Sequence, residues 1–327
     1  MTVAYAPGKI ILVGEHAVVY GRPAIAVPVT QVQAQVKVEK GEPGQGIVVV
    51  AKDLGRVFSL ARQERDATVG PLQATVANVL AYLGLTTDHD LTVFVESSIP
   101  MARGLGSGAA VSTAMTRAIA RHFSRELTAG EISQLVYETE KLHHGTPSGI
   151  DNTVIACERP VHFVRGESPE TVRVGRSLLL IIADTGVESP TREVVGAVRR
   201  AREEARERYD DLFDAVGDIV VEVRRAIERG ELRHVGRLLD ENHRLLQEMG
   251  VSSSRLDDLV HAAKRHGALG AKLSGAGRGG NMIALVTSET REPVKRALRA
   301  EGAQGLIDTA VEASKDFATS LESFTAS

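Results

Sequence analysis

The sequence predicts an α+β protein of two lobes with a ligand site between them, and two observations support this class. The first half alternates β-like and helical segments, whereas helices dominate after a buried strand predicted over residues 178–183. A polar stretch at 166–177, with glycines and a proline, separates the two halves. We therefore predict an N-terminal domain over residues 1–172 and a C-terminal domain over residues 173–327.

Segments of the first half follow two periodicities. Alternating apolar and polar residues predict strands, and a turn over 41–46 should join the second and third of them into a hairpin. Thr128 and Glu131 form a capping-box pattern at the start of one helix. The predicted strands are residues 3–13, 31–40, 47–51 and 91–95, and the predicted helices are residues 71–83, 109–122 and 128–143.

The second half is mainly helical by the same criteria. After the strand at 178–183, β character returns only over 271–286, around a glycine-rich turn. The predicted helices are residues 191–212, 216–229, 232–249, 254–266 and 292–301.

Composition excludes several classes of function. The chain has 327 residues, 43% of them hydrophobic and 25% charged, which is enough for two cores. The net charge of −3, without basic runs, argues against nucleic acid as a partner, and the longest apolar runs are too short to span a membrane. Because Cys157 is the only cysteine and no signal-like segment begins the chain, we expect a cytoplasmic protein.

Residues 100–110, Pro-Met-Ala-Arg-Gly-Leu-Gly-Ser-Gly-Ala-Ala, are the most informative segment. Glycines let backbone amides approach a ligand, and a helix that begins after them adds unpaired N–H groups and a positive dipole end. This combination is typical of a phosphate site, with a tight strand–helix turn as the alternative. The spacing fits neither a Walker loop nor a dinucleotide fingerprint.

A second glycine-rich segment lies at 274–280. Gly275, Gly277 and Gly280 fit the dinucleotide pattern, but an apolar strand follows where a helix should begin. We interpret the segment as the opposite wall of the phosphate site, and a glycine-rich hairpin turn is the alternative.

Polar residues near the N-terminus are further candidates. Lys9 lies in an otherwise apolar strand, where it is either an edge-strand charge or a cation directed into a cleft. Glu15 and His16 follow a glycine at the end of that strand, a common place for binding groups.

Two carboxylates flank a glycine- and proline-rich loop. Glu140 lies near the end of a helix and Asp151 follows the loop, so one could bind a metal while the other moves a proton. The alternative is a solvated glutamate and an aspartate that caps a turn. A transition-metal site formed by Glu140 with His143 or His144 lacks a visible third ligand.

Taken in order, these segments resemble the GHMP small-molecule kinases. Residues 6–17, 100–110 and 272–280 resemble the three motifs of that family, and residues 144–152 are most similar to its mevalonate kinase branch. The resemblance covers nearly the whole chain, including residues 242–252. It implies a ribosomal-S5-domain-2-like N-terminal lobe and a ferredoxin-like C-terminal lobe, with ATP and substrate in the cleft between them.

The resemblance also implies a reaction and roles for residues. The reaction is phosphorylation of the 5-hydroxyl of mevalonate by ATP and Mg²⁺, in isoprenoid biosynthesis, by an enzyme that often forms homodimers. Asp151 would be the catalytic base beside Lys9, and Glu140, with Ser107 as a second candidate, would bind the metal. The substrate would contact Lys9, Glu15, His16, Ser148, Asp151 and Thr191. ATP would contact Pro100, Met101, Ala102, Arg103, Gly104, Leu105, Gly106, Ser107, Gly108, Ala109 and Ala110. The second loop would contribute Ser274, Gly275, Ala276, Gly277 and Arg278.

The chain departs from the family pattern at two positions. Ser107 and Gly108 stand where two adjacent serines are usual, and the second of these commonly binds the metal, so Glu140 is the firmer metal ligand. Arg278 stands where glycine is common. It is either a solvent-facing turn residue or an extra cation near the phosphates or the substrate carboxylate.

Three other functions fit the same fold. One is a GHMP kinase that acts on phosphomevalonate, homoserine, a sugar or the 3-hydroxyl of mevalonate, although the Asp151 and Lys9 pair argues against branches without a general base. A related decarboxylase is another, but residues 140–152 do not resemble that branch. The third is a non-catalytic sensor of ATP and a small ligand, which would not need the base and the metal ligand.

Overall fold

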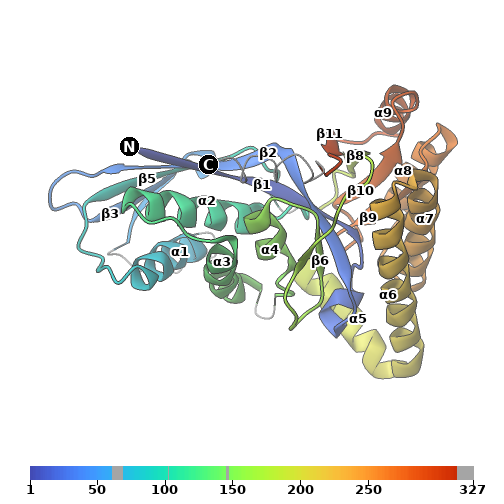
Figure 1. Cartoon of the computed structure of the whole chain (residues 1–327), viewed down its shortest axis with the longest axis horizontal. Coiled ribbons are helices and arrows are strands. Elements are labelled where there is room, and N and C mark those ends of the chain that lie inside the picture. Colours follow the sequence, from blue (N-terminus) through green and yellow to red (C-terminus); the bar gives the residue numbers. More distant parts are fainter. Residues whose placement is uncertain (61–68, 102, 145–146, 315–327) are drawn as a thin grey trace, which may run out of the picture.

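The first lobe is built on two long antiparallel strands, β1 and β2, which run from its outer end toward the second lobe (Figure 1). The computed structural model describes residues 1–60, 69–101, 103–144 and 147–314. The first half of β2 also pairs with β6 and the second half with β5. The strands of this sheet are β1 (Thr2–Val13), β2 (Ala24–Lys40), β3 (Ile47–Ala51), β4 (Arg56–Ser59), β5 (Leu91–Ser97), β6 (Val161–Phe163) and β7 (Glu170–Thr171).

The predicted hairpin between residues 31–40 and 47–51 is wrong. β5 lies between these strands, because it pairs antiparallel with β2 and parallel with β3, while β3 pairs antiparallel with β4. Val48 and Val49 project to opposite faces of β3 and both are buried. This two-sided burial is typical of an interior strand, whereas a residue pattern alone does not specify a partner.

Four helices cover one face of this sheet (Figure 1). α2 packs on β1 and β2 through small buried residues such as Ala110 and Ala114, which permit close approach. The capping box at α3 is confirmed, since the Thr128 amide donates to Glu131 at 2.7 Å and the Glu131 amide donates back to Thr128 at 3.3 Å. α4, not foreseen as a helix, begins after Gly149. These helices are α1 (Val69–Tyr82), α2 (Ser107–His122), α3 (Ala129–His144) and α4 (Ile150–Cys157).

The second lobe has an antiparallel sheet in the order β11-β8-β10-β9. One helical segment follows β8 and another lies between β10 and β11, so the order is the βαββαβ of a ferredoxin-like fold, as expected. The strands are β8 (Leu178–Asp184), β9 (Gly270–Ser274), β10 (Asn281–Val286) and β11 (Gly305–Val311). The helices are α5 (Thr191–Glu204), α6 (Arg206–Arg229), α7 (Leu232–Glu248), α8 (Ser254–Arg265) and α9 (Arg291–Ala300).

One predicted helix boundary in this lobe is wrong. The chain breaks at Ala205, which has an extended φ of −139°, rather than after residue 212. α6 continues because its buried apolar face runs without interruption through Leu212, Phe213 and Val216.

The two lobes share a continuous set of buried apolar residues. The sheets change between β7 and β8, and the proposed boundary at 172/173 stays a prediction. Within the described ranges, no helix combines the length and the apolar character needed to cross a bilayer.

Candidate active site

Lys9 and Asp151 form the centre of the candidate site. Lys9 is only 4% exposed on β1, and its Nζ lies 2.8 Å from Oδ1 of Asp151 in the first turn of α4. Its backbone amide donates to the carbonyl of Leu105 at 2.9 Å, so the same residue contacts the first glycine loop. Lys9 is therefore directed inward, as the cleft interpretation requires.

Glu140, near the end of α3, is the third charged group here. It is 7% exposed, and its pKa is raised to about 7, first by burial and then by the negative charge of Asp151, while Lys9 partly offsets the shift. Among the described residues no hydrogen bond or ion pair to its carboxyl is found. A buried carboxyl with this pKa gains stability when a cation arrives.

The first glycine loop requires glycine at residue 106. Gly106 has a φ of +72°, and a β-carbon there would lie 2.9 Å from Cγ of Lys9. α2 begins at Ser107, two residues earlier than predicted, so the amides of residues 107–109 belong to its first turn. Such amides have no intrahelical acceptors and favour an anion, with Lys9 close by.

The two glycine loops lie next to each other across the lobes. A β-carbon on Gly275 would be 3.9 Å from Cα of Gly104. Arg103 pairs with Asp184 of β8 at 3.3 Å, and the side-chain amide of Asn281 donates to the Arg103 carbonyl. This contact is what two walls of one phosphate site require.

Glu15 and Lys272 form an ion pair that is almost completely buried between the lobes, with exposed side-chain fractions of 1% and 0%. Burial raises the pKa of Glu15 and lowers the pKa of Lys272, and each charge opposes the shift of the other. Lys272 was not among the predicted site residues. Its position in an apolar strand is the same signal that identified Lys9.

His16 also joins the lobes. Its Nε2 donates to the carbonyl of Ala276 at 2.8 Å, which leaves Nδ1 as an acceptor. Burial lowers its pKa to about 4, so the ring is neutral at pH 7. Ser274 adds a further link, because its hydroxyl donates to the carbonyl of Ile11 at 2.8 Å.

Other predicted residues are more exposed than Lys9 and Glu140. Ser148 is half-buried and accepts a 3.4 Å hydrogen bond from the Ile150 amide, while Thr191 is exposed at the start of α5. Pro100 and Met101 are exposed. Ala102, and the side chains of His143 and His144, lie outside the part that the structure describes.

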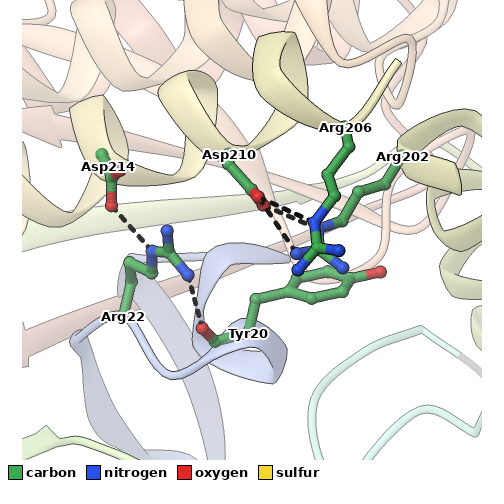
Figure 2. A network of polar contacts seen from close by, with 6 residues as sticks. All are labelled: Tyr20, Arg22, Arg202, Arg206, Asp210 and Asp214. Atoms are coloured by element: carbon green, nitrogen blue, oxygen red, sulfur yellow. Dashed lines mark hydrogen bonds and ion pairs between the residues drawn. The ribbon is translucent and has the colours of Figure 1, made fainter. Parts of the chain in front are cut away.

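A polar network holds the C-terminal end of α5, near Arg202 (Figure 2). Arg202 binds both carboxylate oxygens of Asp210, at 2.7 and 3.1 Å, and its guanidinium lies 5.0 Å from the ring centre of Tyr20. Arg22 bridges the Tyr20 carbonyl and Asp214, both at 2.8 Å. Since Tyr20 ends the short helix η1 (Ala17–Tyr20) that follows His16, the network ties α5 to the candidate site.

Comparison with known proteins identifies the family. Residues 72–158 match the model of the GHMP kinases N terminal domain, and residues 223–304 match that of GHMP kinases C terminal. The chain belongs to the GHMP kinase family. A mevalonate kinase of Thermococcus sibiricus is 36% identical over 319 residues, which cover 93% of this chain and 94% of the relative. One of Aeropyrum pernix is 37% identical over 288 residues, with coverages of 86% and 87%.

Solved structures agree with this assignment. An L. major mevalonate kinase in complex with R-mevalonate superposes with a TM-score of 0.81 at 28% identity, over 96% of this chain and 97% of that one. The expected two-lobe GHMP kinase fold is therefore confirmed, and the chain is an ATP-dependent kinase similar to mevalonate kinases.

The acidic residues of this GHMP kinase fit magnesium, whereas the transition-metal alternative involves His143 and His144, whose side chains lie outside the described part. Within the described ranges, no group of three or more His, Cys, Asp or Glu side chains could hold a metal. Mg²⁺ is usually bound by one or two carboxylates together with nucleotide phosphates and water. Glu140, whose carboxyl is buried and without a partner among the described residues, beside Asp151, fits that donor set.

Proposed function

We propose that this GHMP kinase transfers the γ-phosphoryl group of ATP to the 5-hydroxyl of mevalonate. The observation that carries the proposal is the 2.8 Å contact between Lys9 and Asp151 at the first glycine loop. The similarity of this chain to mevalonate kinases, over most of their length, supports mevalonate as the acceptor.

Asp151 and Lys9 divide the work on the acceptor hydroxyl. Asp151 accepts its proton while the oxygen bonds to the γ-phosphorus, and the bond from that phosphorus to the β–γ bridging oxygen breaks to release ADP. Lys9 stabilises the negative charge on the attacking oxygen, and it orients Asp151 through their ion pair. Such reactions depend on position and charge more than on covalent chemistry.

The nucleotide side of the site uses backbone groups. The first turn of α2 and the adjacent glycine loops hold the phosphates, and Ser274 and Gly275 close the opposite wall. Glu140 and, as a second candidate, Ser107 would hold Mg²⁺, which when bound offsets charge on the transferring group. Glu15 and His16 shape the acceptor side through their buried contacts with the second lobe, and Ser148 and Thr191 border it. We also propose that the enzyme forms a homodimer and that it lies in the cytoplasm.

One panel assay tests it. The protein is incubated with Mg-ATP and mevalonate, phosphomevalonate, homoserine or galactose, and ADP release is measured, with phosphorus NMR to locate the new phosphate. We expect rapid ADP release with mevalonate and a phosphate on its primary hydroxyl. ADP release with another acceptor, or phosphate on the 3-hydroxyl, refutes the proposed acceptor group. No ADP release with any acceptor favours the alternative of a non-catalytic sensor of ATP and a small ligand.

A further inference from the structure

Arg278 holds an unusual backbone conformation for a residue with a side chain. Its φ is +58°, in the left-handed region that favours glycine. Among the described residues only four that are not glycine have a positive φ, and His16, at +61°, is another of them. Strained residues of this kind cluster where function requires them.

Packing imposes this conformation on the loop. A β-carbon on Gly277 would lie 2.0 Å from the carbonyl oxygen of Val251, and one on Gly279 would lie 2.6 Å from that of Glu188. The Arg278 amide also donates to the Val251 carbonyl at 2.7 Å. Residues 277–280 therefore pack tightly against Glu188 and Val251 of the same lobe. Arg278 alone among them is exposed.

Arg278 is also the unpaired cation of the site. Four cations lie on β1, β9 and the two glycine loops, and three of them have a carboxylate partner: Lys9 with Asp151, Arg103 with Asp184, and Lys272 with Glu15. Across the described ranges, no carboxylate lies within ion-pair distance of Arg278. Its side chain has only a weak 3.4 Å contact with the Gly250 carbonyl.

The position of Arg278 points to the acceptor rather than to ATP. Gly275 adjoins the first glycine loop, but Arg278 lies three residues further on, against the connection between α7 and α8. Its charge acts on His16, where it contributes to the lowered pKa of the imidazole. His16 belongs to the segment assigned to the acceptor side, whereas the phosphates have the amides of α2.

We propose that Arg278 binds the carboxylate of the acceptor and thereby selects an acid over a neutral alcohol. This inference rests on the proposed function, because mevalonate carries its one charge at the end opposite to the reacting hydroxyl. A guanidinium matches a carboxylate with two parallel hydrogen bonds, and its planar fork is not replaced by lysine. The close backbone packing fixes the point from which the Arg278 side chain extends before the acceptor arrives.

The test compares Arg278→Ala, Arg278→Lys and Arg278→Gly with the wild type and with Arg233→Ala, which removes an exposed arginine from α7. The Michaelis constants for mevalonate and ATP are measured, and then that for the neutral primary amide of mevalonate. Arg278→Ala and Arg278→Gly should raise KM for mevalonate about ten- to a hundredfold. They should leave KM for ATP and for the amide within about twofold, and Arg278→Lys should be intermediate.

Arg278→Gly separates binding from folding. Glycine relieves the left-handed strain, so this variant should melt at the same or a higher temperature than the wild type while its affinity for mevalonate falls. Unchanged KM for mevalonate, a rise in KM for ATP alone, or an equal rise for mevalonate and its amide would each overturn the proposal.

Calorimetric titration with mevalonate distinguishes a failure of the carboxylate-binding proposal from a failure of the proposed reaction. A wild type that binds mevalonate but transfers no phosphate refutes the reaction, and weaker binding by Arg278→Ala then still supports the carboxylate contact. A wild type that does not bind mevalonate refutes both.

Discussion

Lys9 and Asp151 meet through a 2.8 Å ion pair between the middle of β1 and the first turn of α4. The lysine is buried, whereas the aspartate side chain retains 29% exposure. The pair is therefore open on the aspartate side, where an acceptor hydroxyl can approach. This asymmetry supports the proposed roles, in which Asp151 accepts the proton and Lys9 stabilises charge.

Replacing Asp151 by Asn should abolish turnover without preventing nucleotide binding. The amide keeps the shape of the side chain but cannot accept the hydroxyl proton, so kcat should fall by at least about a hundredfold. Calorimetry should show ATP affinity within about threefold of wild type. Asp218→Asn, which alters an exposed aspartate of α6, serves as the control and should remain active. Near-normal turnover in Asp151→Asn would remove its assignment as the base.

Magnesium affinity should rise with pH around neutrality. The pKa of Glu140 is about 7, and the metal needs the carboxylate, so Mg²⁺ competes with a proton there. The apparent Mg²⁺ affinity measured in the presence of ATP should increase from pH 6 to pH 8 and then level off. Glu140→Gln should bind Mg²⁺ weakly at every pH in this range. A pH-independent affinity in the wild type would show that Glu140 is not a ligand.

Glu140→Gln should also stabilise the protein at alkaline pH. The pKa of Glu140 is raised from 4.5 to about 7 on folding, so the stability contributed by its proton is present below pH 4.5 and is lost as pH rises through 7. Glutamine stays neutral throughout. Between pH 5 and pH 8, the free energy of unfolding should therefore shift in favour of the variant by on the order of 2 kcal/mol. Urea titrations of both proteins at the two pH values measure this shift, and parallel curves would contradict it.

The sequence predicts the candidate site better than the strand order. Lys9 and the glycine loops were identified from local sequence alone. A buried lysine and a run of glycines both lower the stability of the fold, so their presence indicates a functional role. The partner of β3 was missed because strand pairing is non-local, and β5 enters the sheet between β2 and β3 from a distant part of the chain.

The same limit applies to side-chain partners. Glu15 and His16 were expected beside the substrate, yet their contacts are with Lys272 and Ala276, more than 250 residues away. No local pattern encodes which cation neutralises a buried carboxylate. The break at Ala205 likewise depends on how α5 and α6 pack, including the contact of Arg202 with Asp210.

Gly106→Ala should lower activity more than the same substitution at a glycine with open space beside its Cα. The new β-carbon would lie 2.9 Å from Cγ and 3.1 Å from Cε of Lys9, so the side chain that pairs with Asp151 would have to shift. We expect kcat to fall at least about tenfold. Gly84→Ala is the matched control, since Gly84 has a similar φ of +70° and open space around it. Both variants should lose about 1 kcal/mol from left-handed strain, but only Gly106→Ala should lose turnover. Equal kinetics in the two variants would contradict the steric argument.

Lys272→Met should strongly destabilise the fold, because it leaves the Glu15 carboxylate buried without a counter-charge. The expected loss is about 3–5 kcal/mol in the free energy of unfolding, measured by urea titration. Adding Glu15→Gln removes the uncompensated charge, so the double variant should recover at least about half of the loss. Lys52→Met provides the exposed counterpart, since Lys52 and Glu96 form a 3.1 Å pair with both side chains 55% exposed, and it should cost less than about 1 kcal/mol. If Glu15→Gln makes Lys272→Met no more stable, the two residues are not coupled, and the lobes must be joined by the hydrogen bonds of His16 and Ser274 instead.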